Sequence, residues 1–173
     1  ELRALEAAHP DLITADSPTQ RVGVEPHSAF PDAEHIVPML SLDSTQDSAE
    51  VRRFAERVRR GLEDEPGYIL EPKLDGASIE LVYEDGLFVR GVTRGNGRVG
   101  EVVTDNLRTI PSLPLRLREV ERPAPELLAI RGEVIMHLSA FEELNERMVA
   151  QGSEPYVNPR NSASGSLRQL DSR

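Results

Sequence analysis

Apolar residues recur at helical spacing in the stretch that follows Asp47. At intervals of three or four positions come Val51, Phe54, Ala55, Val58 and Leu62. This is the period of a helix with one apolar face. The run Asp47-Ser48-Ala49-Glu50 resembles a capping box. The pattern therefore predicts an amphipathic helix that runs to about Glu63.

The period shortens after Pro66-Gly67 and becomes typical of strands. Strand-like runs cover residues 68–71, 78–83 and 87–93. The latter two are joined by Glu84-Asp85-Gly86, a hairpin turn signal. A further run, residues 127–136, is apolar enough to be a central strand. Consecutive hairpins imply an antiparallel sheet, so the predicted fold class is α+β, with antiparallel sheets flanked by helices.

The remaining segments are shorter and less regular. Residues 1–8 resemble the end of a helix, and residues 9–35 carry prolines and little periodicity, which is typical of a linker. A short helix over 101–109 would end at Ile110-Pro111. Ser139 to Glu142 is a second capping box, which opens a helix with Phe141, Leu144 and Met148 on one face. Residues 156–169 are expected to form a polar loop that passes into a short helix.

Composition narrows the class of protein. The chain has 173 residues, a net charge of −10 and no cysteine, so a disulfide scaffold or a thiolate-bound zinc within it is excluded. No apolar run approaches the roughly 20 residues of a membrane span, and no signal peptide is visible. A chain that opens inside a helical stretch without an initiator Met is expected to be a fragment of a longer protein. We expect that protein to be soluble, cytoplasmic and monomeric.

Several arginines give local positive charge in a chain whose net charge is negative. They lie in or beside loops of small polar residues, at Arg94, Arg98, Arg160, Arg168 and Arg173. Such arginines suit phosphate contacts, although plain solvation would place them on the same loops. The segment from Asn158 to Arg168 in particular suits close approach of a phosphodiester backbone, with an ordinary surface loop as the alternative.

Lys73 stands between two carboxylates in the run Glu71-Pro72-Lys73-Leu74-Asp75-Gly76. By itself this run also suits a charged hairpin turn. Strand alternation would place Glu71, Lys73 and Asp75 on one face of the sheet. A free lysine has a pKa of about 10.4, and carboxylates stabilise its charged form further, so a nucleophilic Lys73 needs an opposing cation. We therefore expect a site assembled around Mg²⁺ or arginine and an anionic substrate.

The spacing G-x-G-x-x-G occurs from Gly95 to Gly100, yet a dinucleotide-binding fold is not predicted. That fold needs a parallel strand and a full crossover helix after the motif. Here the preceding strand belongs to a hairpin, and Pro111 stops the helix after about two turns. A glycine-rich loop that holds Arg94 beside phosphate or ribose fits better. Arg131 and Glu133 interrupt the most apolar strand, where a structural ion pair and a functional role are equally consistent with the sequence.

Taken in order, several motifs together resemble the bacterial NAD⁺-dependent DNA ligases. The motifs are Pro38 to Asp43, Glu71 to Gly76, Thr93 to Gly97 with Gly100-Glu101, Arg108 to Ile110, Arg131 to Val134, and Asn158 to Gln169. The resemblance covers nearly the whole chain. It implies an adenylation domain of the nucleotidyltransferase (ATP-grasp-like) fold over residues 24–173, truncated at its C-terminal side. Residues 1–23 would be the tail of a preceding helical subdomain and its connector.

The resemblance also implies roles for individual residues. Lys73 would attack the α-phosphorus of NAD⁺ and form a lysyl-adenylate, with Asp75 as a second catalytic residue. The implied NAD⁺-binding residues are Ser41, Leu42, Glu71, Arg94 and Glu133. Arg160 and Arg168 would grip nicked double-stranded DNA near the 5′ phosphate, and Glu101 would help to hold a metal. Implied cofactors are NAD⁺ and Mg²⁺, with zinc only in a domain outside this chain. No membrane partner is implied.

Three positions depart from the family pattern. Asn96 and Val102 stand where the family usually has aspartate, and Ser44 replaces a usual Asn. The two lost carboxylates motivate a second hypothesis, a degenerate or truncated module that binds nucleotide or nicked DNA without ligation. A third hypothesis is a related lysine-dependent enzyme, such as an ATP-dependent ligase or a capping enzyme, and the pattern from Asn158 to Gln169 disfavours it.

Overall fold

The computed structural model describes residues 2–21, 29–118 and 123–172. Contacts within the chain define two compact units. The larger unit comprises Glu1–Met39 with Leu74–Arg173, and the smaller unit is Leu40–Lys73. Each unit is described by itself.

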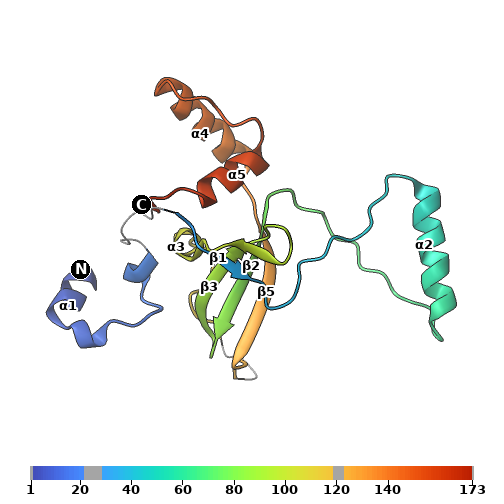
Figure 1. The fold of residues 1–173 in the computed structure, drawn as a ribbon, viewed down its shortest axis with the longest axis horizontal. Coiled ribbons are helices and arrows are strands. Elements are labelled where there is room, and N and C mark those ends of the chain that lie inside the picture. The colour runs from blue at the N-terminus through green and yellow to red at the C-terminus, as the bar shows by residue number, and fades with distance from the viewer. Residues whose placement is uncertain (1, 22–28, 119–122, 173) are drawn as a thin grey trace. The chain divides into compact units, whose positions relative to one another are not determined.

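An antiparallel three-stranded sheet forms the centre of the larger unit (Figure 1). Its strands are β2 (Ala77–Glu84), β3 (Leu87–Thr93) and β5 (Leu127–Val134), in the order β3-β2-β5. The predicted hairpin between β2 and β3 is confirmed. Asp85 and Gly86 have φ angles of 47° and 77°, and two successive positive φ angles are what the tightest hairpin turns require.

β5 does not occupy the central position that its apolar sequence predicts. Among the described residues β2 is central, since it pairs with β3 on one side and with β5 on the other. Burial follows this order: β2 contains fully buried residues, whereas no residue of β5 is buried. Neighbours in the sheet, which composition does not reveal, decide which strand is enclosed.

A second, two-stranded sheet lies within the stretch predicted to be linker and helix. β1 (Asp32–Glu34) pairs with β4 (Val99–Glu101), with Ala33 opposite Gly100. The predicted linker also contains two short 3₁₀ helices, η1 (Pro10–Leu12) and η2 (Pro18–Arg21); its residues 22–28 lie outside the described part. Because residues 99–101 are a strand, helix α3 covers only Thr104–Arg108 and begins later than predicted.

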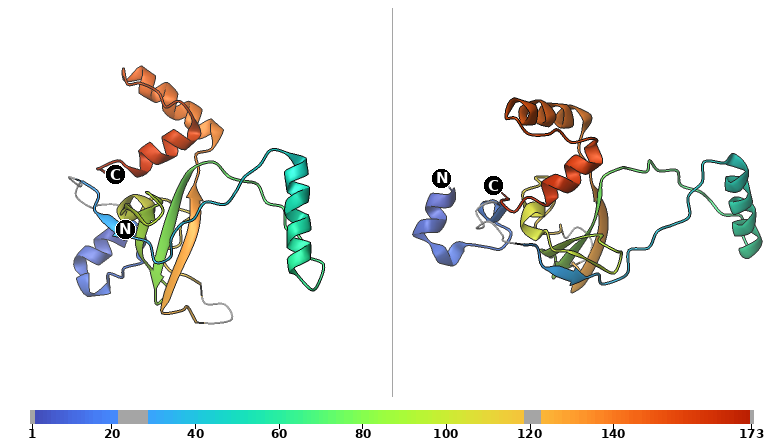
Figure 2. Two further views of the ribbon diagram at one scale, coloured as in Figure 1. Left: turned by 45° about the vertical axis from the view of Figure 1, so that its right-hand side comes forward. Right: turned by 45° about the horizontal axis from the view of Figure 1, so that its top comes forward.

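The other helices of the larger unit are α1 (Leu2–Ala8), α4 (Leu138–Ala150) and α5 (Pro159–Leu167). The predicted capping box at Ser139 is wrong, because α4 begins at Leu138 and its N-cap is His137, which makes no side-chain cap. α5 has a side-chain cap: Asn158 Oδ1 accepts a hydrogen bond of 2.8 Å from Asn161 N. Figure 2 shows α4 and α5 at one end of the three-stranded sheet, and α5 packs against β2.

One core holds these elements together. It is formed by the buried side chains of Ile79, Tyr83, Phe88, Val103, Leu107, Leu113, Leu115 and Leu167. Burying an apolar side chain of this size contributes about 1.5–3 kcal/mol. The members come from β2, β3, α3, α5 and the loop after α3, so the same core fixes all the elements that surround the site described below.

The smaller unit consists of helix α2 (Ser48–Gly61) between segments without regular structure. The predicted helix is confirmed, and Asp47 caps it by accepting a hydrogen bond of 2.8 Å from Ala49 N. The strand predicted over residues 68–71 is wrong, because residues 62–76 form neither helix nor strand. Pro66 and Pro72 flank this run and lack the N–H group that strand pairing needs.

Among the described residues, no helix combines the length and the apolar character needed to cross a membrane.

Candidate functional site

A polar pocket of about 250 Å³ lies where β2 begins and β3 ends. It is lined by Gly76, Ala77, Ser78, Thr93, Arg94, Gly95, Arg160, Ser164, Leu167 and Arg168. The antiparallel pairing of β2 with β3 brings residues 76–78 close to residues 93–95. Residues 160–168, in and directly after α5, complete the lining. The pocket therefore unites Arg94, Arg160 and Arg168, three of the predicted site residues, although the sequence separates the first from the other two by more than sixty positions.

The loop that carries Arg94 is held by backbone bonds at both ends. Arg94 N donates to Ser78 O at 2.9 Å, and Gly97 N donates to Arg94 O at 2.9 Å. Gly95 has a φ of 53°, and a Cβ atom there would collide with the carbonyl of Val99. Only glycine fits such a turn without strain. The loop is thus a tight turn between β3 and β4, and the helix that follows, α3, has only five residues. The full crossover helix of a dinucleotide-binding fold is therefore not formed after the glycine motif.

Asn96 supplies acceptors to this turn. Its Oδ1 accepts hydrogen bonds of 2.9 Å from Arg98 N and 2.9 Å from Val99 N. An aspartate carboxylate could accept the same two bonds. Asparagine at this position therefore shapes the loop as an aspartate would, without the negative charge.

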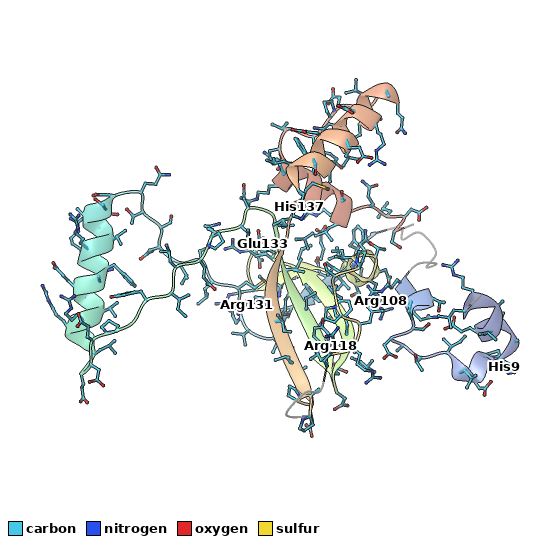
Figure 3. The ribbon with its side chains drawn as sticks, turned by 180° about the vertical axis from the view of Figure 1, so that it is seen from behind. His9, Arg108, Arg118, Arg131, Glu133 and His137 are labelled. Carbon is cyan, nitrogen blue, oxygen red and sulfur yellow. The ribbon has the colours of Figure 1, made fainter. Side chains whose placement is uncertain are left out.

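Glu133 fastens the start of β2. Its Oε1 accepts a hydrogen bond of 3.1 Å from Gly76 N, and its Oε2 accepts one of 2.6 Å from the Ser78 hydroxyl. Figure 3 shows Glu133 and Arg131 along β5. Arg131 donates through Nη2 to Val37 O at 2.9 Å and to Pro38 O at 2.7 Å. Both side chains project from the same face of β5, and each holds a different segment of backbone.

Two carboxylates pair with the arginines of α5. Arg160 Nη1 lies 3.4 Å from Asp75 Oδ1, and Arg168 Nε donates to Glu101 Oε2 at 2.7 Å. All four side chains are at least one-third accessible to solvent, so each pair contributes little to stability. A bound phosphate would compete with these carboxylates for the arginines.

Among residues 2–21, 29–118 and 123–172, no three His, Asp or Glu side chains gather as metal ligands. Glu101, the predicted metal residue, already pairs with Arg168.

The other predicted site residues belong to the smaller unit. They are Ser41, Leu42, Glu71 and Lys73, and all four are exposed. Asp75 belongs to the larger unit. The expectation that Glu71, Lys73 and Asp75 share one face of a sheet is wrong, because this stretch is not a strand.

Sequence reasoning missed a buried pair beneath the Arg94 loop. His35 Nε2 lies 3.0 Å from Arg94 O; a carbonyl oxygen only accepts, so Nε2 carries a proton. His35 Nδ1 lies 3.3 Å from Glu80 Oε1, and the two side chains are 0% and 1% exposed. The available signal was Glu80 itself, a carboxylate inside the apolar run of residues 79–83.

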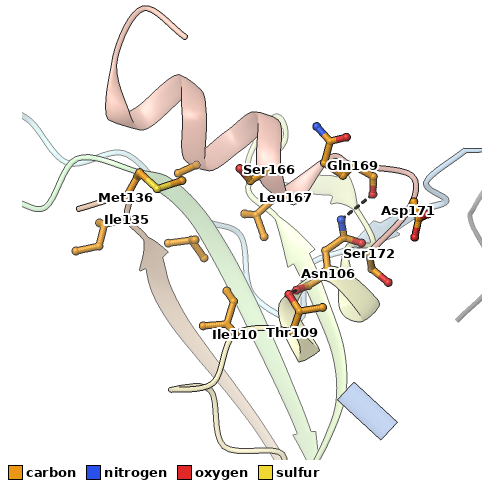
Figure 4. A pocket seen from close by; sticks show the side chains of 12 residues that line it. Asn106, Thr109, Ile110, Ile135, Met136, Ser166, Leu167, Gln169, Asp171 and Ser172 are labelled. Atoms are coloured by element: carbon orange, nitrogen blue, oxygen red, sulfur yellow. Dashed lines mark hydrogen bonds between the residues drawn. The ribbon is translucent and has the colours of Figure 1, made fainter. Parts of the chain in front are cut away.

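A second pocket, of about 360 Å³, lies between α3, α5 and the end of β5 (Figure 4). Asn106 Nδ2 donates there to Gln169 O at 2.7 Å. None of the predicted site residues lines this pocket.

Comparison with known families gives two matches that together cover most of the chain. Residues 27–173 match the model of the NAD-dependent DNA ligase adenylation domain. Residues 1–23 match the model of the DNA ligase-like, N-terminal NAD⁺-binding domain.

Curated relatives are similar along the full length of this chain. The DNA ligase of Alkalilimnicola ehrlichii is 53% identical over 174 residues, which cover 100% of this chain and 26% of that protein. The DNA ligase of Roseiflexus sp. is 50% identical, over 99% of this chain and 26% of that protein. The DNA ligase of Geobacter metallireducens is 51% identical, over 100% of this chain and 26% of that protein. The chain thus spans about a quarter of the length of these relatives.

Proposed function

This chain belongs to the NAD-dependent DNA ligase adenylation domain family, and on that premise we propose that Lys73 is the residue that becomes adenylated. The Lys73 Nζ atom attacks the α-phosphorus of NAD⁺. A phosphorus–nitrogen bond forms, the bond between the two phosphates breaks, and nicotinamide mononucleotide leaves. The ammonium group must first lose one proton, because only the neutral amine has a lone pair for the attack, and the nitrogen loses a second proton as the phosphorus–nitrogen bond forms.

One observation carries the proposal: Lys73 is the only lysine of the chain, whose other basic side chains at neutral pH are all arginines. Arginine stays charged in proteins and is not a nucleophile. Lys73 also precedes Gly76, the first residue of the polar pocket, by three positions. Covalent geometry limits the Cα separation of these two residues to about 11 Å.

The polar pocket is proposed to receive the AMP portion of the nucleotide. Arg94 supplies positive charge from a loop whose backbone is fixed at both ends. Glu133 supports this role by fixing Gly76 and Ser78. Catalysis of phosphoryl transfer depends mainly on such positioning and on charge neutralisation. Glu71 is proposed to contact the adenine, and Ser41 and Leu42 to line the same nucleotide site.

The remaining parts of the proposal concern the whole ligase. Nicked double-stranded DNA would bind near Arg160 and Arg168, with Asp75 and Glu101 as their competing partners. AMP would pass to the 5′ phosphate before the 3′ hydroxyl displaces it. The same proposal includes magnesium as a cofactor, zinc in a domain beyond this chain, a monomeric state and the cytoplasm as location. It also includes the nucleotidyltransferase (ATP-grasp-like) fold and a domain boundary after residue 23.

The test is intact-mass spectrometry of the full-length ligase after incubation with NAD⁺ or with ATP. We expect one added adenylyl group with NAD⁺, none with ATP, and none in Lys73→Ala with either nucleotide. Peptide mapping should locate the group on Lys73. Arg59→Ala, an exposed change on α2, is the matched control and should be adenylated normally. An unchanged adenylate in Lys73→Ala would refute the proposal.

A further inference from the structure

Arg21 attaches the N-terminal segment, residues 2–21, to the adenylation domain through three hydrogen bonds. Arg21 Nη1 donates to Arg108 O at 2.9 Å and to Ile110 O at 3.0 Å, while Nη2 donates to Leu113 O at 3.0 Å. The three carbonyls come from the last turn of α3 and the loop that follows it. Figure 3 marks Arg108 at this place.

The chemistry of the contact suits a permanent attachment. Carbonyl groups at a helix C-terminus lack partners within the helix and carry partial negative charge. A guanidinium offers several donors in a rigid fork, so it serves three carbonyls at once. Lysine has a point charge on a flexible stem and cannot reproduce that geometry.

The base to which Arg21 attaches is rigid. Leu107 of α3 and the preceding Val103 are 0% and 1% exposed, and Val103 N donates to Gly91 O at 2.9 Å. Gly91 lies on β3, whose last residue, Thr93, lines the polar pocket. An element bound to α3 is therefore held in a defined position relative to that pocket.

The N-terminal segment is also braced internally. The hydroxyls of Ser17 and Thr19 each donate to the Glu6 carboxylate at 2.5 Å, which joins α1 to η2. Arg116 Nε donates to Asp16 Oδ2 at 2.6 Å and adds a second, more exposed link to the adenylation domain. Arg21 at the end of η2 thus transmits the position of α3 to α1.

We propose that Arg21 is a positioning residue for the reaction with NAD⁺: it docks the end of the N-terminal NAD⁺-binding domain on α3 of the adenylation domain. The inference rests on the proposed function. A domain that holds one part of NAD⁺ assists the reaction only while its position relative to Lys73 and the polar pocket is restricted. Sealing of a nick that already carries AMP needs no NAD⁺ and therefore does not need this attachment.

The experiment compares these two reactions in the full-length ligase. The variants are Arg21→Ala, Arg21→Lys and the control Arg118→Ala, whose side chain is exposed. For Arg21→Ala we expect kcat/KM for adenylate formation from NAD⁺ to fall at least about tenfold, mainly through KM, while sealing of a pre-adenylated nick stays within about twofold. Arg21→Lys should lie between Arg21→Ala and the wild type, and Arg118→Ala should match the wild type.

A second readout does not depend on activity. In Arg21→Ala, hydrogen exchange of the backbone amides of residues 12–21 should become faster, while β2 keeps its protection. Unchanged NAD⁺ kinetics, an equal loss in both reactions, or unchanged exchange would each overturn the proposal. Failure of the proposed function is distinguishable, because the wild type would then form no adenylate, and the exchange measurement would still decide the attachment.

Discussion

The Nδ1 atom of His35 lies 3.3 Å from Oε1 of Glu80, and neither side chain is accessible to solvent. The two residues are 45 positions apart: His35 directly follows β1, and Glu80 lies within β2. Through Nε2 the same imidazole holds the carbonyl of Arg94. This contact links the central strand to the loop that supplies the pocket with positive charge.

His35→Ala should therefore destabilise the fold and loosen the Arg94 loop. The substitution removes the contact to Arg94 O and leaves the buried Glu80 side chain with one donor, Ile36 N at 3.4 Å. A buried polar group that loses its partner costs about 1–3 kcal/mol. Urea unfolding at neutral pH measures the loss. The double variant His35→Ala with Glu80→Ala should lose less than the sum of the single changes; strictly additive losses would show that the two side chains are not coupled.

Acidification should detach the N-terminal segment at Asp16. The hydrogen bond from Arg116 holds the pKa of the Asp16 carboxyl below its ordinary value. A lowered pKa in the folded state means that the contact stabilises the fold above the unfolded pKa of about 3.9, and that this contribution is lost as the pH falls through the folded value. Hydrogen exchange of residues 10–21 measured from pH 6 to pH 3, with unfolding of the whole domain followed in parallel, should show the change.

Asp16→Asn is the control for that measurement. It removes the titrating group, so the pH dependence contributed by this contact should disappear and exchange at pH 6 should already be faster than in the wild type. An identical pH profile in the wild type and in Asp16→Asn would contradict the assignment. The Glu6 carboxyl, whose pKa is lowered by the hydroxyls of Ser17 and Thr19, titrates with the same sign and supplies the remaining dependence.

Arg168→Ala should weaken binding of the full-length ligase to nicked DNA, whereas Glu101→Gln should strengthen it. The Glu101 carboxylate is paired with the Arg168 guanidinium at 2.7 Å. The neutral glutamine side chain would no longer compete with DNA phosphate for the positive charge of Arg168. Loss of one phosphate contact lowers the slope of log K against log salt by about 1. Fluorescence anisotropy over a series of salt concentrations measures both affinity and slope. Arg59→Ala serves as the control for a general loss of charge, and equal effects of the two arginine variants would rule out a specific contact.

Asn96→Asp should be tolerated, in contrast to Asn96→Ala. Aspartate keeps an oxygen that can accept from Arg98 N and Val99 N, so its free energy of unfolding should stay within about 0.5 kcal/mol of the wild type. Alanine removes both bonds and should cost about 1–2 kcal/mol. Thermal or urea unfolding of the pair distinguishes the two effects, and equal stability of both variants would show that Oδ1 does not shape the loop.

Comparison of particular elements shows how far local sequence reached. α2 and the β2–β3 hairpin were predictable because their determinants lie within a few residues: Asp47 caps the helix it precedes, and Asp85-Gly86 adopts the turn its composition favours. The glycine-rich loop after Arg94 was predictable as a turn for the same reason. The resemblance of the lysine motif to that of the ligase family was also recognisable from the sequence.

Contacts between distant segments could not be predicted. Arg21 donates a hydrogen bond to Arg108 O, 87 positions away, and Arg168 donates one to Glu101, 67 positions away. Strand β1 pairs with β4. The run 68–71 has the composition of a strand but no partner among the described residues. For this protein, the order of residues determined the cap of α2 and the turn between β2 and β3, because these act through neighbours along the chain. Only the tertiary structure decided which strand is central, which carboxylate is buried and which arginines share a pocket, because those outcomes depend on pairing and burial between segments that the chain itself keeps apart.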